Sequence, residues 1–364
     1  MGFRCGIIGL PNVGKSTIFN ALTATGAEVA NYPFCTIDPN IGVVSVPDPR
    51  LDFIAEILHP LKKTYTTMEF LDIAGLVKGA SRGEGLGNKF LGHIREVDAI
   101  VHIVRCFDNP DVVHVDGLVD PVRDIEIVNT ELLLADLETI DKRLLSVEKR
   151  VKTGDREAGQ TLEFLRMIKD TLGRGIPCRN LVPTEEHTEV RKGLHLLTDK
   201  KVLYTANVSE AVLKGAQGYV SAMEEVAARE GALVITICGD MEAEIVELPP
   251  EERAVFLEDL GLRESGLEKL IRAGYDLLGL ITFYTTVGTE LRAWTIPRGT
   301  RANQAAGKIH SDMERGFIRA EILHFEDFKA VGNIAVAREK GLVRSEGRDY
   351  QINDGDIVVF RFNV

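Results

Sequence analysis

Apolar residues in the first third of the chain gather in short runs that are rich in β-branched side chains. The runs are Phe3–Gly9, Ile41–Val46, Met68–Asp72 and Ala99–Cys106. Runs of this length are typical of buried strands. The segments between them, at 16–25, 51–58 and 88–97, have helical spacing. Strands that alternate with helices predict an α/β domain with a mainly parallel sheet, in which ligands bind at the carboxyl ends of the strands.

A different pattern begins near Asp124. Apolar residues recur at spacings of four and three residues, at Leu133, Leu137, Ile140, Leu144, Val147 and Val151. This spacing is an a/d seam, and charged residues fill the gaps. After a break at 152–155, a second helical pattern runs through Leu162, Leu165, Ile168 and Leu172. The two patterns favour an antiparallel helical hairpin that projects as an arm, with two ordinary domain helices as the alternative.

The α/β pattern resumes after the arm. Strands are expected at 202–206 and 232–238, and helices within 241–278. From residue 280, a hairpin around Gly288–Thr289, one main helix at 302–310 and late strands at 320–324 and 356–362 indicate a small α+β domain. We therefore divide the chain into a first part of the α/β domain (1–123), the inserted arm (124–199), its second part (200–279) and a C-terminal domain (280–364).

Composition narrows the class of protein. The chain has 364 residues, more than one ordinary domain, and a net charge of −12, which argues against a surface that is basic all over. Its five cysteines form no C-x-x-C pair and lie mostly in apolar runs, so we expect buried, reduced thiols and a cytoplasmic protein. We expect no membrane helix, because no segment has the unbroken apolar run of about 18 residues that one needs. We expect no signal peptide, because the chain opens on a predicted strand without a basic, apolar and small-residue pattern.

One segment is basic although the chain as a whole carries a net negative charge. Between Arg292 and Arg319 there are six basic residues and two acidic ones. A solvated surface accounts for such an excess, and so does a patch that faces RNA or the ribosome. The sequence leaves both interpretations open.

The chain is organised around one motif, Gly9–Thr17, which follows the first predicted strand and opens the first predicted helix. It fits the phosphate-binding pattern G-x-x-x-x-G-K-[ST] at every position. Glycines allow the backbone amides to surround a phosphate, and the helix N-terminus adds partial positive charge. We expect Lys15 to reach the β- and γ-phosphates and Ser16 to offer its hydroxyl to Mg²⁺.

Two later segments suit the switch loops of such an enzyme. Thr36, in a loop after Pro33-Phe34, is assigned to the Mg²⁺ and γ-phosphate of a first switch. Asp72, at the end of the third predicted strand, is expected to bind Mg²⁺ through water, and the Gly75 amide to sense the γ-phosphate. The next residue is Leu76, where Ras-like enzymes carry the glutamine that orients the attacking water. Hydrolysis is then slow, or another group positions the water.

His114 is a candidate for that group. It lies in a polar loop just after the fourth predicted strand. An imidazole can accept or donate a proton near neutrality. An ordinary loop histidine is the alternative.

The base-recognition motif departs from that of a GTPase. A guanine site needs Asn-Lys-x-Asp, whereas this chain has Asn207, Val208 and Glu210. Glutamate is one methylene longer than aspartate and misses the guanine edge, so we expect a site that binds adenine through backbone groups near Asn207 and Val208. Losing a paired polar contact of this kind changes specificity by orders of magnitude. Gly239-Asp240, after the next strand, is a second candidate base-flanking loop.

Taken together, these motifs resemble the Obg-like ATPase (YchF) subfamily of translation-factor-class P-loop NTPases, over essentially the whole chain. The resemblance implies an α/β P-loop NTPase domain with an inserted antiparallel helical hairpin and a C-terminal β-grasp (TGS) domain. It implies ATP preferred over GTP, Mg²⁺ at Ser16 and Thr36, and a histidine, here His114, that assists hydrolysis. The ATP phosphates are implied to lie along Asn12, Val13, Gly14, Lys15, Ser16 and Thr17. Gly239-Asp240 departs from the small residues usual in the subfamily.

The resemblance also implies partners and a role. Asn12 matches the loop asparagine of K⁺-stimulated members of the wider class, which makes K⁺ a candidate cofactor beside Mg²⁺. The ribosome, through rRNA or a ribosomal protein, is the implied partner of the TGS domain and the arm, in a regulatory, stress-linked role. Two alternatives stay open: a GTPase assembly factor in which Glu210 reads guanine, and a nucleotide-gated ribosome-binding protein with little turnover.

Overall fold

The computed structural model divides into two compact units, which we describe separately. The first comprises Met1–Val43 and Glu69–Leu270, and the second comprises Val44–Met68 and Ile271–Val364. The sequence pattern does not predict that residues 44–68 group with the C-terminal segment. The structure describes residues 3–25, 40–74, 86–110, 112, 114, 117–182, 184–213 and 218–363.

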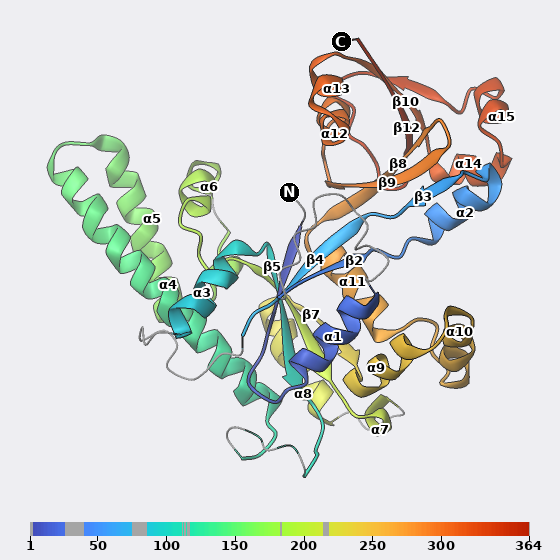
Figure 1. Ribbon diagram of the computed structural model, residues 1–364. Helices are drawn as coiled ribbons and strands as arrows, with labels where there is room; N and C mark the ends of the chain where they lie inside the picture. The colour runs from blue at the N-terminus through green and yellow to red at the C-terminus, as the bar shows by residue number, and fades with distance from the viewer. Residues whose placement is uncertain are drawn as a thin grey trace. The chain divides into compact units, whose positions relative to one another are not determined.

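A six-stranded sheet forms the centre of the first unit, in the order β2-β4-β1-β5-β6-β7 (Figure 1). Its strands are β1 (Arg4–Ile8), β2 (Ile41–Ser45), β4 (Thr67–Asp72), β5 (Ala99–Arg105), β6 (Lys201–Asn207) and β7 (Leu233–Ile237). β1 lies between β4 and β5 and is parallel to both, and β5, β6 and β7 are also parallel neighbours. The chain passes into the second unit within β2 and returns within β4. The strands predicted from the apolar runs are thereby confirmed.

Helices lie between these strands or follow the last of them, β7. Those between are α1 (Lys15–Thr25), α3 (Leu86–Glu96), α7 (Glu210–Leu213) and α8 (Gly218–Glu230), and those after β7 are α9 (Gly239–Glu247), α10 (Pro250–Asp259) and α11 (Gly266–Leu277), which continues into the second unit. α1 packs beside α9, which brings the segments after β1 and β7 together. Cys5, Cys106, Cys178 and Cys238 are buried free thiols, as expected, and Cys35 lies outside the described residues. Within the described parts of the chain, no helix has the length and apolarity to cross a membrane.

The predicted helical hairpin is confirmed. α4 (Pro121–Lys152) and α5 (Arg156–Gly173) run antiparallel, and a short 3₁₀ turn (Cys178–Asn180) and α6 (Glu185–Lys192) follow (Figure 1). Asp120 and Asp155 cap the two long helices by accepting hydrogen bonds from backbone amides. The predicted seam forms the hairpin core, since Ile140, Leu144 and Val147 are buried there against the apolar residues of α5.

The second unit contains a mixed sheet in the order β11-β10-β12-β8-β9-β3. Its strands are β3 (Lys62–Thr64), β8 (Leu280–Val287), β9 (Glu290–Pro297), β10 (Phe317–Leu323), β11 (Arg344–Glu346) and β12 (Ile357–Phe362). Its helices are α2 (Pro49–Leu58), α12 (Ala302–Ile309), α13 (Ser311–Arg315), α14 (Phe325–Val331) and α15 (Ile334–Glu339). The predicted hairpin, the main helix and the two late strands are all present. The short elements α13, α14, α15 and β11 are additions that the sequence pattern does not predict.

Buried contacts explain why residues 44–68 belong to the second unit. Leu51 and Ile54 of α2 share a core cluster with Tyr284 and Leu291 of the β8–β9 hairpin. The Tyr284 hydroxyl donates to Asp48 Oδ2. These contacts join positions far apart in sequence, so no local sequence pattern predicts them.

Candidate functional site

The phosphate-binding motif adopts the loop that its glycines predict. The loop connects β1 to α1, whose first residue is Lys15. Asn12 and Gly14 have φ of 62° and 86°, a region that asparagine and glycine enter most easily. A side chain at Gly9 would place its Cβ 2.6 Å from the Ile103 carbonyl oxygen of β5, so only glycine fits there. The loop is therefore held close to the carboxyl end of the neighbouring strand.

Lys15 and Asp72 meet at this loop. The Lys15 ammonium forms an ion pair with Asp72 Oδ1 at the end of β4, and the two side chains are 12% and 20% exposed. Ser16, the next residue of α1, is exposed. The structure thus brings together the predicted phosphate ligand and one predicted metal ligand, and presents a hydroxyl beside them.

The donor set suits Mg²⁺. A hydroxyl and a carboxylate are hard oxygen ligands, and Mg²⁺ is typically held by one or two protein oxygens, water and substrate phosphates rather than by a protein cage. Among the described residues, no cluster of three histidine, cysteine or acidic side chains that could hold a metal occurs. Thr36 and Gly75, the other predicted switch residues, lie outside the described residues.

Asn207 links the base motif to the phosphate loop. Its Nδ2 donates to the Val13 carbonyl oxygen at 2.9 Å, and its Oδ1 accepts from the Gly239 amide at 3.0 Å. A Cβ at Gly14 would clash with the same carboxamide. This side chain therefore acts as a brace between two loops, a use that the sequence pattern alone does not predict.

Val208 and Glu210 differ in exposure. Val208 is 3% exposed, and its amide donates to the Ile237 carbonyl oxygen of β7 at 2.8 Å. Glu210 is the exposed first residue of α7. The Val208 amide is thus committed to the protein's own backbone, whereas the Glu210 side chain faces outward at the start of a helix.

His114 is paired with a buried carboxylate. Its Nε2 lies 2.9 Å from Asp124 Oδ2 in the first turn of α4, and both side chains are almost fully buried. Burial raises the pKa of Asp124, and the His114 and Arg123 side chains act in the opposite direction. Asp124 Oδ1 has no hydrogen-bond partner among the described residues, while Arg123 Nη2 lies 3.6 Å from it. The carboxylate fixes the orientation of the imidazole by occupying its Nε2.

Arg105 is a site residue that the sequence analysis misses. Arg105 is the last residue of β5 and is only 2% exposed. Its guanidinium donates to the carbonyl oxygens of Phe107, Asn109 and Val112 at 3.1, 3.2 and 3.0 Å. It holds the loop that leads to His114. An arginine at the end of an otherwise apolar strand is the signal that could have revealed it, since buried arginine is rare without such partners.

Comparisons with known proteins cover the whole chain. The family described as "50S ribosome-binding GTPase" matches residues 4–150, and "Protein of unknown function (DUF933)", a YchF C-terminal family, matches residues 280–363. A "Ribosome-binding ATPase YchF" of Bacillus subtilis (strain 168) is 54% identical over 100% of both chains. The protein of the same name in Escherichia coli O157:H7 is 52% identical, again over 100% of each. This chain belongs to the YchF family.

Solved structures agree with this assignment. One described as "Structure of the Schizosaccharomyces pombe YchF GTPase" matches with a TM-score of 0.89 and 36% identity, over 99% of this chain and 98% of that one. A "GTP binding protein from Pyrococcus horikoshii OT3" shares the fold, with a TM-score of 0.62 and 21% identity over 99% and 100% of the two chains. As a YchF family member with this fold, the chain is a P-loop nucleoside triphosphatase.

Proposed function

We propose that the protein is a ribosome-associated regulatory ATPase that hydrolyses ATP to ADP and phosphate. The observation that carries the proposal is the contact of Asn207 with Val13, which puts the base-recognition motif directly against the phosphate loop. A nucleotide whose phosphates follow 12–17 then has its base at the carboxyl end of β6. The YchF relatives named ribosome-binding ATPases support the same activity.

The choice of ATP over GTP rests on Glu210. A guanine site uses an aspartate three residues after the asparagine, whereas this chain has a longer glutamate at the start of α7. Adenine has an unprotonated N1 and so gains nothing from a carboxylate there; its amino group instead needs a backbone acceptor near Asn207 or Val208. The two sequence relatives described above are named ATPases, whereas the solved structure of the Schizosaccharomyces pombe protein is named a GTPase. Competition between ATP and GTP for binding is therefore the informative test.

Mg²⁺ and K⁺ are the proposed cations. Ser16, Thr36 and Asp72 would hold Mg²⁺, which when bound neutralises charge on the β- and γ-phosphates. Lys15 would leave its ion pair with Asp72 to bind the phosphates, and the freed carboxylate would then face the metal through water. Asn12, in its left-handed conformation, is the proposed link to K⁺.

Hydrolysis needs a group that positions water, because Leu76 has no hydrogen-bonding side chain. We assign this role to His114, oriented by Asp124 and carried on the loop that Arg105 holds. ATP would order the segments that contain Thr36 and Gly75, and hydrolysis would release them. The protein would act in the cytoplasm, and the TGS domain and the α4–α5 arm would contact the ribosome.

Calorimetric titration with ATP and with GTP, in Mg²⁺ and K⁺, tests the proposal. We expect a clear ATP preference, loss of binding or turnover in Lys15→Ala, and wild-type behaviour of the exposed control Lys152→Ala. Preference for GTP would instead identify a GTPase assembly factor in which Glu210 reads guanine. Tight ATP binding without phosphate release, even with ribosomes present, would identify a nucleotide-gated binding protein.

A further inference from the structure

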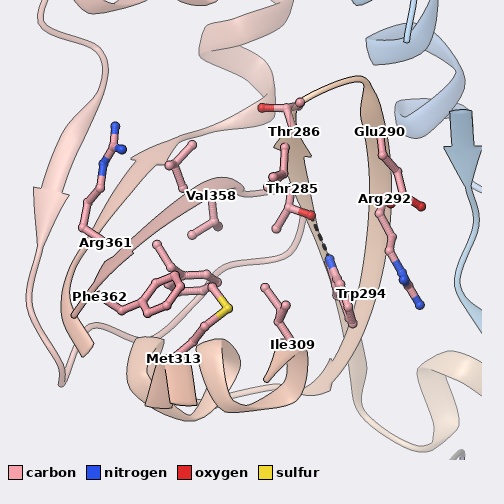
Figure 2. Close-up of a pocket in the computed structure, with 14 residues that line it drawn as sticks. Thr285, Thr286, Glu290, Arg292, Trp294, Ile309, Met313, Val358, Arg361 and Phe362 are labelled. Atoms are coloured by element: carbon pink, nitrogen blue, oxygen red, sulfur yellow. Dashed lines mark hydrogen bonds between the residues drawn. The ribbon is translucent and has the colours of Figure 1, made fainter. Parts of the chain in front are cut away.

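The C-terminal unit contains a pocket of about 660 Å³ between two parallel strands (Figure 2). β8 and β12 are paired at Tyr284 and Ile357, and the Tyr284 amide donates to the Asp356 carbonyl oxygen at 2.8 Å. Beyond this pairing, residues 285–287 of β8, together with Gly288 of the turn after it, and residues 358–362 of β12 line opposite sides of the pocket. The pocket volume falls within the range of roughly 300–1,000 Å³ that is usual for ligand sites.

The pocket walls are mainly apolar. Ile309 of α12 and Met313 of α13 form one side, and Val358 and Phe362 of β12 form another (Figure 2). Trp294 of β9 closes the pocket, and its indole N–H donates to Thr285 Oγ1 at 2.9 Å. A methionine in such a wall adapts to the shape of its occupant.

Large apolar side chains are exposed around this end of the sheet. Val287 is 71% exposed at the end of β8, and Phe362 is 41% exposed at the end of β12. Phe317 pairs with Phe362, which places its neighbour Ile318, 58% exposed, at the same end. Exposed apolar side chains that gather around an apolar pocket mark a surface for another protein.

Positive charge borders the same surface. Arg361, which lines the pocket, shares the Glu321 carboxylate with Arg319 and Arg338. Three half-exposed guanidinium groups around one carboxylate leave an excess of positive charge. Arg292 lies on the other side of the pocket, with its guanidinium carbon 4.2 Å from the centre of the Trp294 ring, and the charge of Glu290 beside it is met by Lys62 at 3.4 Å. An acidic partner is complementary to this border.

We propose that this pocket binds an acidic segment of a partner protein through one large apolar anchor side chain. The anchor would fill the space between Trp294 and Met313, and acidic residues beside it would meet Arg361 and Arg292. The exposed apolar rim favours a protein over RNA. The Trp294 ring also offers little to a nucleobase, because it already stacks on Arg292 and lies nearly parallel to Phe283. This site is separate from the proposed ATPase activity and does not depend on it.

The test is a selection from random twelve-residue peptides displayed on phage, with the full-length protein as bait. Peptides that also bind a Val287→Asp, Phe362→Asp double variant are removed. We expect enrichment of peptides with one phenylalanine, leucine or tryptophan among aspartates and glutamates. A synthetic peptide of the enriched sequence should bind at least tenfold more weakly to each single variant and to Arg361→Ala, and should weaken with added salt.

Val255→Asp is the matched control, because Val255 is 58% exposed on α10 in the other unit. It should leave peptide binding unchanged. Val287→Asp, Phe362→Asp and Val255→Asp should keep wild-type melting temperatures, Arg361→Ala should lose only the small contribution of its ion pair with Glu321, and all variants should keep wild-type ATP affinity. The proposal is overturned by an absence of enriched peptides, by enrichment without acidic residues, or by equal binding to Val287→Asp. A parallel selection of twenty-nucleotide RNAs that alone yields binders sensitive to Val287→Asp would assign the pocket to RNA instead.

Discussion

The Asn207 carboxamide donates to the Val13 carbonyl oxygen at 2.9 Å, from the end of β6 to the middle of the phosphate loop. The same side chain accepts from the Gly239 amide. One buried residue therefore sets the position of the phosphate loop relative to the loop that follows β7. The geometry of the nucleotide site depends on this brace before any nucleotide is bound.

Asn207→Ala removes both hydrogen bonds and leaves the Val13 carbonyl and the Gly239 amide buried without a partner. Each such group costs about 1–3 kcal/mol. We expect a lower free energy of unfolding in urea and at least tenfold weaker ATP binding by calorimetry. Asn20→Ala, at an exposed position of α1, is the control and should change neither quantity. Wild-type ATP affinity in Asn207→Ala would show that the brace is dispensable for binding.

The nucleotide loop could be predicted from sequence because its chemistry is local. Gly9, Gly14 and Lys15 lie within one short motif, and the strand before it and the helix after it have clear apolar patterns. The apolar seam of the arm could also be predicted from sequence, because a helical hairpin buries residues at a fixed local spacing. The seam of the arm is confirmed by its buried side chains, and the strand and helix predicted on either side of the loop are present as β1 and α1.

Long-range pairing could not be predicted in the same way. Nothing near Asp124 in the sequence shows that it holds His114, and nothing near Asp48 shows that it accepts from Tyr284. Asn207 was expected at the base, but its side chain contacts Val13, because a carboxamide can satisfy two buried backbone groups at once. Such roles follow from the folded arrangement of several strands and not from any one motif.

Asp124→Asn tests whether His114 works as part of a pair. The Asp124 carboxylate lies 2.9 Å from His114 Nε2 and fixes the orientation of the imidazole, whereas an asparagine amide can also turn its NH₂ group toward the same nitrogen. If the oriented imidazole positions the attacking water, turnover should fall about tenfold or more. ATP affinity should stay near wild type. Wild-type turnover together with a lower melting temperature would mean that Asp124 only supports the loop.

Tyr284→Phe tests the attachment of residues 44–68 to the C-terminal unit. The substitution leaves the Tyr284 ring in place and removes its hydrogen bond to the buried Asp48 carboxylate. We expect a loss of about 1–3 kcal/mol in the free energy of unfolding. Tyr219→Phe is the control, because the Tyr219 hydroxyl bonds to Asp108 at the surface, and it should cost less than about 0.5 kcal/mol. Equal effects would contradict a specific role for the buried bond.

Glu321 gives a stability effect whose pH dependence has a definite sign. Its hydrogen bond to Arg361 is the main cause of its lowered pKa, and Arg319 and Arg338 act in the same direction. A carboxyl group with a lowered pKa in the folded protein stabilises the fold above its ordinary pKa, and this contribution is lost as pH falls through the lowered value. We expect Glu321→Gln to cost about 1 kcal/mol at pH 7, a modest figure because the arginines are half-exposed. In urea unfolding, the difference from wild type should shrink steadily below pH 4.5 and with added salt. A difference that stays constant down to pH 3 would show that the side chain stabilises the sheet through packing and not through charge.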